Sequence, residues 1–416
     1  MELLAPAGSF KKLKYALHYG ADAVYCGLPD FSLRGGRVNQ FTKDDLALGI
    51  KYAHARNKKV YVTVNIYPHN SQLEKIEKEL AQIIKMKPDA LIVSDPGVID
   101  FIRTKYSRQE IHLSTQANCI NYRSIEFWKK QGVKRIILAR EMKLKEVSEA
   151  EKKVKNIELE YFVHGAMCMA YSGRCMLSAW INQKSANQGR CTQPCRWPWV
   201  IKEGGQKKFK NKRPKKEMLI EEANGEAYIF NSKDLCLIEY LDELEKAGVS
   251  SLKIEGRNKS LYYLAVVVKY YRQALDVSGK KRESVVREAK KEFSKLGNRE
   301  YTTGFAFGPD ESIQNYRDSR NSSDYEMVGE VWESKQDEEL FKAGYYSIFV
   351  HNAIFKGSFL DVVDKEKIRT LKVLDIWDQN KKPQESAHGG TQKIWYIKFS
   401  EPLDRWSILR SLVKKK

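Results

Sequence analysis

The chain has 416 residues, of which 42% are hydrophobic and 11% aromatic; this excludes bulk disorder and predicts a large domain with a smaller one. The excess of 73 basic over 53 acidic residues gives a net charge of +20, which favours polyanionic partners, nucleic acid above all. No stretch approaches the roughly 18–20 uninterrupted apolar residues of a membrane-spanning helix, and the N-terminus lacks the pattern of a signal peptide. We therefore expect a cytoplasmic protein with no membrane partner.

The first 165 residues alternate short apolar runs with helical patterns. Seven of these runs predict buried strands, and an eighth, at 251–256, follows a helical pattern at 234–247. Strands that alternate with helices pair in parallel through right-handed crossovers. Eight such units in about 275 residues predict a TIM-type (β/α)8 barrel, with a doubly wound open sheet as the alternative. The first seven expected strands are 2–5, 23–26, 60–65, 90–94, 111–115, 135–139 and 159–164.

A long connection separates the seventh and eighth strands, at about 165–231. Loops of this length inside a compact domain are usually functional. This one contains four of the seven cysteines, and the run KEGGQKKFKNKRPKKE at 202–217. The basic run is either a solvated surface loop or an arm that contacts phosphates, as the lysines at 280–295 could also do.

The remainder of the chain has a different sequence pattern. After a linker at 306–326, short apolar runs punctuated by Gly344 and a Gly-Gly pair predict a small all-β barrel over 327–416. The barrel-type domain then spans 1–305. Aromatic residues of the small domain, such as Tyr345, Tyr346 and Phe355, are candidates for stacking on unpaired bases. The expected strands are 328–332, 345–350, 359–363, 371–376 and 393–399.

The cysteine spacing points to an iron–sulfur cluster. Cys168, Cys175, Cys191 and Cys195 lie in the long connection, and in a reducing compartment spaced cysteines indicate metal binding or catalysis. No Cys-x-x-Cys occurs in the chain, which counts against structural zinc and a thioredoxin-like pair. Four thiolates at looser spacing are compatible with a cubane cluster. They begin after the seventh strand, on the face where barrel enzymes have their active sites.

The fourth ligand has an alternative. Cys236 is also available, although it lies within an apolar helical pattern, Leu235-Cys236-Leu237-Ile238, that is more typical of a core thiol. Cys195 is preferred because it shares a loop with the other three. The last two cysteines, Cys26 and Cys119, are expected to pack as small hydrophobic residues.

The cysteine-bearing segment resembles a known family. The motif YFVHGAMCMAYSGRCMLS at 161–178 is closely similar to the signature of the collagenase-like peptidases of family U-32, and NQGRCTQPCRW at 187–197 and KIEGR at 253–257 extend the similarity. The resemblance implies a barrel with a [4Fe–4S] cluster and oxygen-independent hydroxylation. The most similar branch modifies tRNA, converting the wobble uridine to 5-hydroxyuridine with prephenate as hydroxyl source. Sister branches act on ribosomal RNA or on ubiquinone precursors.

A hydroxylating barrel mouth should bind a dicarboxylate and an RNA base. Arginine clasps carboxylates bidentately, and amides can orient a base. His164 and Glu255 are the candidates for proton transfer. For each candidate the alternative role is to cap a loop or close a hydrogen bond inside the barrel. The candidate substrate-binding residues near strand ends are Arg34, Asn65, Gln116, Arg140, Lys253 and Arg257.

Functions besides tRNA hydroxylation stay open. The family's name suggests a peptidase, but His-Glu-x-x-His and Gly-x-Ser-x-Gly are absent from the sequence, and a thiolate bound to iron is not free to act as a nucleophile. The chain could also be a hydroxylase of ribosomal RNA, or a non-catalytic iron–sulfur protein that serves a partner enzyme. The sequence makes no prediction of the oligomeric state.

Overall fold

The computed structural model describes residues 1–29, 32, 41–171, 174–188, 190–197, 222–223, 226–227, 231–308, 313–315, 323–332, 337–390 and 394–413. The chain forms two compact units. The first comprises Met1–Phe10, Ala23–Asn258 and Asn298–Asn321, and the second comprises Lys11–Asp22, Lys259–Gly297 and Ser322–Lys416. Arg34 and the basic run at 202–217 lie outside the described residues.

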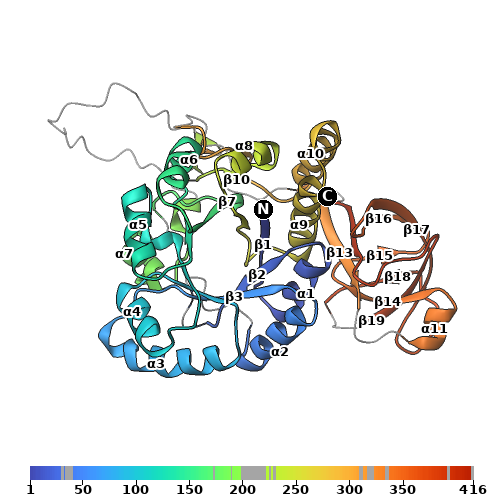
Figure 1. Cartoon of the computed structure of the whole chain (residues 1–416). Helices are drawn as coiled ribbons and strands as arrows, with labels where there is room; N and C mark the ends of the chain where they lie inside the picture. Colours follow the sequence, from blue (N-terminus) through green and yellow to red (C-terminus); the bar gives the residue numbers. More distant parts are fainter. Residues whose placement is uncertain are drawn as a thin grey trace, which may run out of the picture. The chain divides into compact units, whose positions relative to one another are not determined.

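The first unit is built on a closed parallel barrel. Eight strands follow one another in the order β11-β1-β2-β3-β4-β5-β6-β7, and β7 pairs with β11 to close the ring (Figure 1). The predicted TIM-type barrel is therefore confirmed, and the open-sheet alternative is wrong. The strands are β1 (Glu2–Pro6), β2 (Ala23–Cys26), β3 (Lys59–Val64), β4 (Ala90–Val93), β5 (Ile111–Leu113), β6 (Arg135–Ile137), β7 (Glu158–Ala166) and β11 (Ser251–Ile254).

Helices of the first unit lie around the outside of this ring (Figure 1). Local sequence defines where several of them begin. The Asp95 side chain accepts a hydrogen bond from the Val98 amide at 3.0 Å, with Pro96 at the first helical position, and the Asn121 side chain caps the next helix in the same way. These helices are α2 (Lys43–His54), α3 (Asn70–Lys85), α4 (Pro96–Lys105), α5 (Tyr122–Lys130), α6 (Leu144–Lys153) and α8 (Leu241–Lys246).

One prediction near the mouth of the barrel is wrong. The expected helical pattern at 234–247 begins instead as a strand, β10 (Asp234–Cys236), followed by a 3-10 turn and α8. β7 extends past the ring and pairs antiparallel with β10, which in turn pairs with β12 (Tyr301–Thr302). The unpaired end of β7 thus supplies backbone partners that outweigh the local helical pattern.

The barrel interior contains a buried network of charges. Arg135 contacts Glu2 at 2.6 Å and Glu160 at 3.1 Å, and Tyr61 donates to Glu2 at 2.6 Å. Glu160 also accepts a hydrogen bond from Lys253 Nζ at 2.7 Å. Burial opposes ionisation of Glu2, but the hydrogen bond and charge of Arg135 hold its pKa below the usual value. Each buried charge in this network therefore has a partner of opposite sign.

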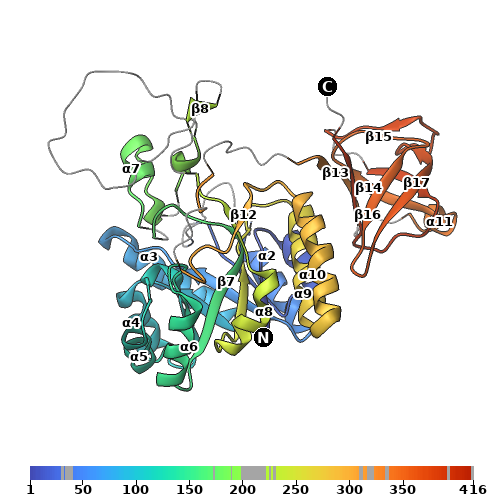
Figure 2. The same cartoon turned by 90° about the horizontal axis from the view of Figure 1, so that it is seen from above.

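The second unit contains a closed antiparallel barrel, whose strands curve around one another in Figure 2. The predicted small β-domain is confirmed, but its closing strand was missed: β20 (Ile408–Leu412) pairs with both β13 and β16. Tyr345 and Tyr346 are buried in β14, and Phe355 is 45% exposed. The barrel strands are, in spatial order, β13 (Tyr325–Val331), β14 (Tyr345–Val350), β19 (Ile394–Phe399), β17 (Ile368–Trp377), β16 (Phe359–Val363) and β20.

Buried contacts join this small barrel to the helices of its own unit. The guanidinium of Arg410, on β20, is fully buried and donates to Glu292 at 2.5 Å and to the Tyr262 hydroxyl at 2.6 Å. The helices of the second unit are α9 (Leu261–Leu275), α10 (Gly279–Ser294), α11 (Glu338–Lys342) and most of α1 (Phe10–His18). None of the helices in the described part of the chain combines the length and apolarity that a membrane crossing requires.

Candidate functional site

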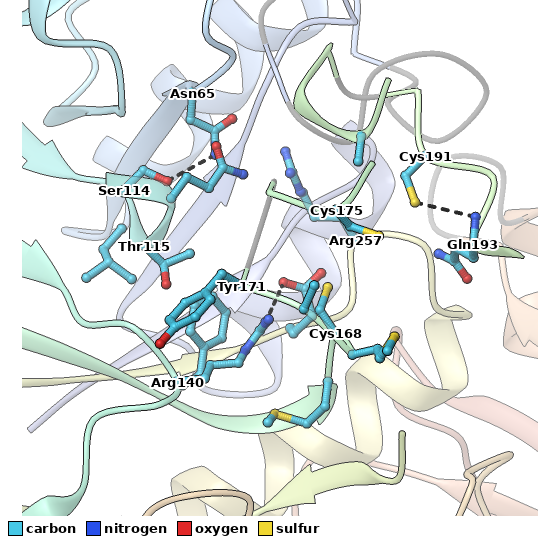
Figure 3. Close-up of a pocket in the computed structure, with 18 of the residues that line it drawn as sticks. Asn65, Ser114, Thr115, Arg140, Cys168, Tyr171, Cys175, Cys191, Gln193 and Arg257 are labelled. Atoms are coloured by element: carbon cyan, nitrogen blue, oxygen red, sulfur yellow. Dashed lines mark hydrogen bonds and ion pairs between the residues drawn. The ribbon is translucent and has the colours of Figure 1, made fainter. Parts of the chain in front are cut away.

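A cavity of about 1080 Å³, open mouth included, lies at the carboxyl ends of the barrel strands (Figure 3). Strand ends supply one part of its wall, including Thr63 on β3, Phe162 on β7 and Lys253 on β11. The segment that follows β7 supplies the rest, with α7 (Leu177–Asn182) and the 3-10 turn Pro194–Arg196. This is the face on which barrel enzymes carry their active sites.

Four cysteines line this cavity: Cys168, Cys175, Cys191 and Cys195. Burial raises the pKa of the Cys195 thiol, the Arg196 guanidinium opposes that rise, and the other three cysteines add to it. The Gln193 amide donates to Cys191 Sγ at 3.4 Å (Figure 3). Amide donors of this kind tune cysteine-bound clusters. Within the described ranges, no three His, Cys, Asp or Glu side chains form a ready-made metal site, so the thiols share a cavity without meeting at one point.

The other three cysteines lie elsewhere. Cys236 is half-buried in β10, opposite His164 of β7, and is not among the residues that line the cavity; its expected position in a helix is wrong. Cys26 and Cys119 are buried, as expected for core thiols, and burial raises the pKa of each to about 12. The structure thus brings together the preferred four cysteines and leaves the alternative ligand outside the cavity.

One wall of the cavity is cationic. Arg257 donates to the hydroxyls of Ser32 at 2.5 Å and Thr63 at 3.2 Å. Arg140 lies 3.5 Å from the Glu255 carboxylate and its guanidinium stacks 4.0 Å from the Phe162 ring centroid.

Lys253 completes this cationic wall. Its ammonium is bound to Glu160 and lies 4.4 Å from the ring centroid of Tyr25. Burial lowers the pKa of Lys253, and Glu160 opposes that change. Three cations therefore face one cavity. Two of them already contact a carboxylate, so the wall as a whole suits an anionic ligand.

Another part of the lining is polar but uncharged. Asn65 Nδ2 donates to the Ser114 hydroxyl at 3.4 Å (Figure 3), and Ser94 donates to Gln116 Oε1 at 3.2 Å. The Thr115 hydroxyl donates to the carbonyl of Leu138 at 3.1 Å. Amides and hydroxyls present both donors and acceptors, as the edge of a nucleobase requires.

Of the eight catalytic and substrate-binding candidates named from the sequence, six line the cavity, His164 does not, and Arg34 lies outside the described residues. His164 is buried beside Tyr301, with ring centroids 5.4 Å apart, where β7 leaves the barrel to pair with β10. Its backbone carbonyl accepts from the Glu255 amide at 2.8 Å. The candidates that line the cavity are Asn65, Gln116, Arg140, Lys253, Glu255 and Arg257.

Part of the lining was not predicted from the sequence. Thr63 and the pair Ser114 and Thr115 lie in or directly after strands β3 and β5, so the rule that strand ends meet at one mouth could have found them. Tyr25 lies at a strand end as well, and its hydroxyl donates to the Ile254 carbonyl at 3.0 Å. Gln193 belongs to the cysteine segment, where no sequence signal distinguished it.

Comparison with known proteins gives consistent matches. The profile described as Peptidase family U32 matches residues 8–316, and that of the Peptidase family U32 C-terminal domain matches residues 323–410. A Haemophilus influenzae relative named "tRNA hydroxylation protein P" is 39% identical, covering 93% of this chain and 91% of its own length. An Escherichia coli relative of the same name is 43% identical, covering 79% and 80%. A Porphyromonas gingivalis relative named "Collagenase" is 30% identical, covering 74% and 73%.

Proposed function

Because this chain belongs to peptidase family U32, we propose that it is an iron–sulfur enzyme that hydroxylates tRNA. In this proposal it converts the wobble uridine to 5-hydroxyuridine and takes the hydroxyl group from prephenate. The observation that carries the proposal is a single cavity that combines four cysteines, a cationic wall and a neutral wall of amides and hydroxyls. The names of the relatives from H. influenzae and E. coli support tRNA hydroxylation.

The cysteines of the cavity suit the proposed cofactor. Four thiols form the donor set of a [4Fe–4S] cluster, and Cys168, Cys175, Cys191 and Cys195 would hold it. Arg196, whose charge acts on Cys195, would offset the negative charge of the thiolates. Replacing the C5–H of uracil by C5–OH removes two electrons from the ring. Prephenate would accept them, because it gives up its hydroxyl group and takes up a hydrogen in its place, and a bound cluster would supply one-electron transfer between the two.

The two walls then divide the substrates between them. Prephenate carries two carboxylates, and Arg257, Arg140 and Lys253 provide the charge to hold them. Asn65 and Gln116 face the same cavity and would hydrogen-bond the O4 and N3–H edge of uracil. The cationic groups would thus hold the anionic co-substrate, and the amides the base, within one cavity.

Hydroxylation at C5 also releases a proton. Glu255 lines the cavity and lies beside Arg140, so its carboxylate is available to accept that proton. Arg140 would then stabilise the deprotonated, charged form of Glu255 between turnovers. His164, which does not line the cavity, has no part in this scheme.

The decisive experiment is nucleoside mass spectrometry of tRNA from a strain that lacks the gene. We expect 5-hydroxyuridine and its derivatives to disappear, and a plasmid copy to restore them. If the modified nucleosides of tRNA are unchanged and a modification in ribosomal RNA is lost, ribosomal RNA is the substrate instead. Collagen cleavage by the cluster-loaded protein, abolished by a change in the cavity, would support a peptidase.

Reconstitution tests the finer points of the proposal. Cluster-loaded protein, tRNA and prephenate should suffice, whereas a partner protein would be required if the chain only served another enzyme. Performing the reaction in ¹⁸O-labelled water identifies the hydroxyl source. Unlabelled product is expected, and incorporation of ¹⁸O would refute prephenate as the oxygen donor.

A further inference from the structure

A second hollow adjoins the cavity. It shares the lining residue Cys175 with the main cavity, so the two hollows meet at that residue. All the residues that line it belong to the described part of the chain and come from α7, its flanks and the segment after β3. They are Tyr67, Arg174, Cys175, Met176, Ala179 and Ser185, together with Asn187.

Two large apolar side chains of this segment are exposed: Met176, which lines the hollow, and Trp180, which follows the lining residue Ala179. Met176 is 79% exposed and Trp180 is 80% exposed. The Trp180 amide donates to the Met176 carbonyl at 2.9 Å, so the two residues are one helical turn apart and share a face of α7. Large apolar residues that gather at the rim of a site mark a surface that a partner covers.

The charge beside this pair is positive. The Arg174 guanidinium lies 5.5 Å from the ring centroid of Tyr67 and donates to the Gln116 carbonyl at 3.4 Å. No carboxylate of the described residues forms an ion pair with Arg174. Lys184 and Arg190, which flank the C-terminal side of α7, are exposed as well. Exposed aromatic surface beside cations without acidic partners is the pattern by which proteins bind single-stranded nucleic acid.

We propose that this hollow, which we call the α7 groove (the seven lining residues with Trp180), binds the unpaired nucleotide next to the target base. The inference rests on the proposed function, because a base can enter the main cavity only if it is unstacked from its neighbour. The neighbour then needs a new stacking partner within one nucleotide of the cavity, and the groove that begins at Cys175 provides it. Trp180 stacks on that base, and Arg174 contacts the adjoining phosphate.

The test compares binding of an anticodon stem-loop RNA to cluster-loaded variants by fluorescence anisotropy. Trp180→Ala is expected to raise Kd by about 5- to 150-fold, the range that loss of base–aromatic stacking gives. Trp180→Phe should retain most of the affinity, because a phenyl ring still stacks. Phe127→Ala is the matched control: Phe127 is 53% exposed, lies on α5 and lines neither hollow, so its Kd should not change. Iron content, measured in every variant, shows that the cluster segment is intact.

A second arm identifies the nucleotide. In an RNA that is abasic at the position beside the target uridine, Trp180→Ala should cost little more affinity, because the stacked base is already missing. Equal losses in intact and abasic RNA would overturn the inference, as would wild-type affinity of Trp180→Ala for intact RNA. If Trp180→Ala alters the oligomeric state of the RNA-free protein and leaves Kd unchanged, the face is a protein interface and the inference fails. A variant that binds normally and still hydroxylates tRNA overturns the groove alone, whereas a wild-type protein that neither binds nor modifies tRNA overturns the proposed function with it.

Discussion

Glu160 is the acidic centre of the network inside the barrel, and Glu160→Gln tests whether charge pairing holds that network together. Glu160 is fully buried and contacts Lys253 at 2.7 Å and Arg135 at 3.1 Å. The substitution keeps the shape but leaves two buried cations short of one negative charge. Breaking a buried pair in this way costs about 3–5 kcal/mol, a large part of the roughly 5–15 kcal/mol by which a domain is stable. We expect that loss in the free energy of unfolding.

The assay should report on the barrel separately from the second unit. Hydrogen exchange at the amides of β7 and β11 does so, because Glu160 lies on β7 and Lys253 lies on β11. Glu151→Gln is the control: the Lys155–Glu151 pair has the same N–O distance of 2.7 Å, but its side chains are 60% and 41% exposed. An exposed pair of this spacing contributes about 0.3–0.5 kcal/mol. If Glu160→Gln costs no more than Glu151→Gln, burial is not what gives the inner pair its importance, and the reasoning is refuted.

Three further predictions follow from buried or clustered groups. Arg410→Met should lower the free energy of unfolding of the second unit by about 3–5 kcal/mol, seen in exchange at β20, because Glu292 loses a buried partner. Burial and a neighbouring lysine lower the pKa of His18 to about 4. Between pH 6.5 and 4 the unfolded chain therefore binds a proton that the folded chain does not, so the free energy of unfolding should fall as pH falls through this window. His18→Gln should reduce this pH dependence. Cys195→Ala should lose cluster iron after anaerobic reconstitution, and Cys236→Ala should retain it; the reverse result would make Cys236 the fourth ligand.

The fold was predictable because local signals repeat along the chain. Most barrel strands are short apolar runs followed by a helical pattern, and β2 has the bounds expected from the sequence. The errors lie where long-range pairing decides the structure. β10 is a strand because the extended end of β7 pairs with it, and β20 exists as the closing partner of β13 and β16; neither partnership leaves a local pattern.

The site was predictable to the extent that barrel topology gathers strand ends. Arg257, Gln116 and Asn65 follow different strands, yet they line one cavity because parallel strands end at one mouth. His164 also lies near the end of a strand, but β7 continues beyond the ring at that point and the ring of His164 packs against Tyr301. The expectation that residues near strand ends line the cavity therefore fails where a strand extends beyond the barrel, since its last residues then pair with another strand.

The three cations of the cavity differ in how well they can be tested, because one of them belongs to two networks. Lys253 faces the cavity and is also the partner of buried Glu160, so changing it destabilises the barrel as well as the site. Arg257 donates to the hydroxyls of Ser32 and Thr63, which are neutral groups. Arg257→Met should therefore raise KM for the dicarboxylate and destabilise the barrel by about 1.5–3 kcal/mol, the contribution of a hydrogen bond to a charged group, which is less than the loss expected for Glu160→Gln. An unchanged KM in a stable Arg257→Met protein would show that the cationic wall does not hold the co-substrate.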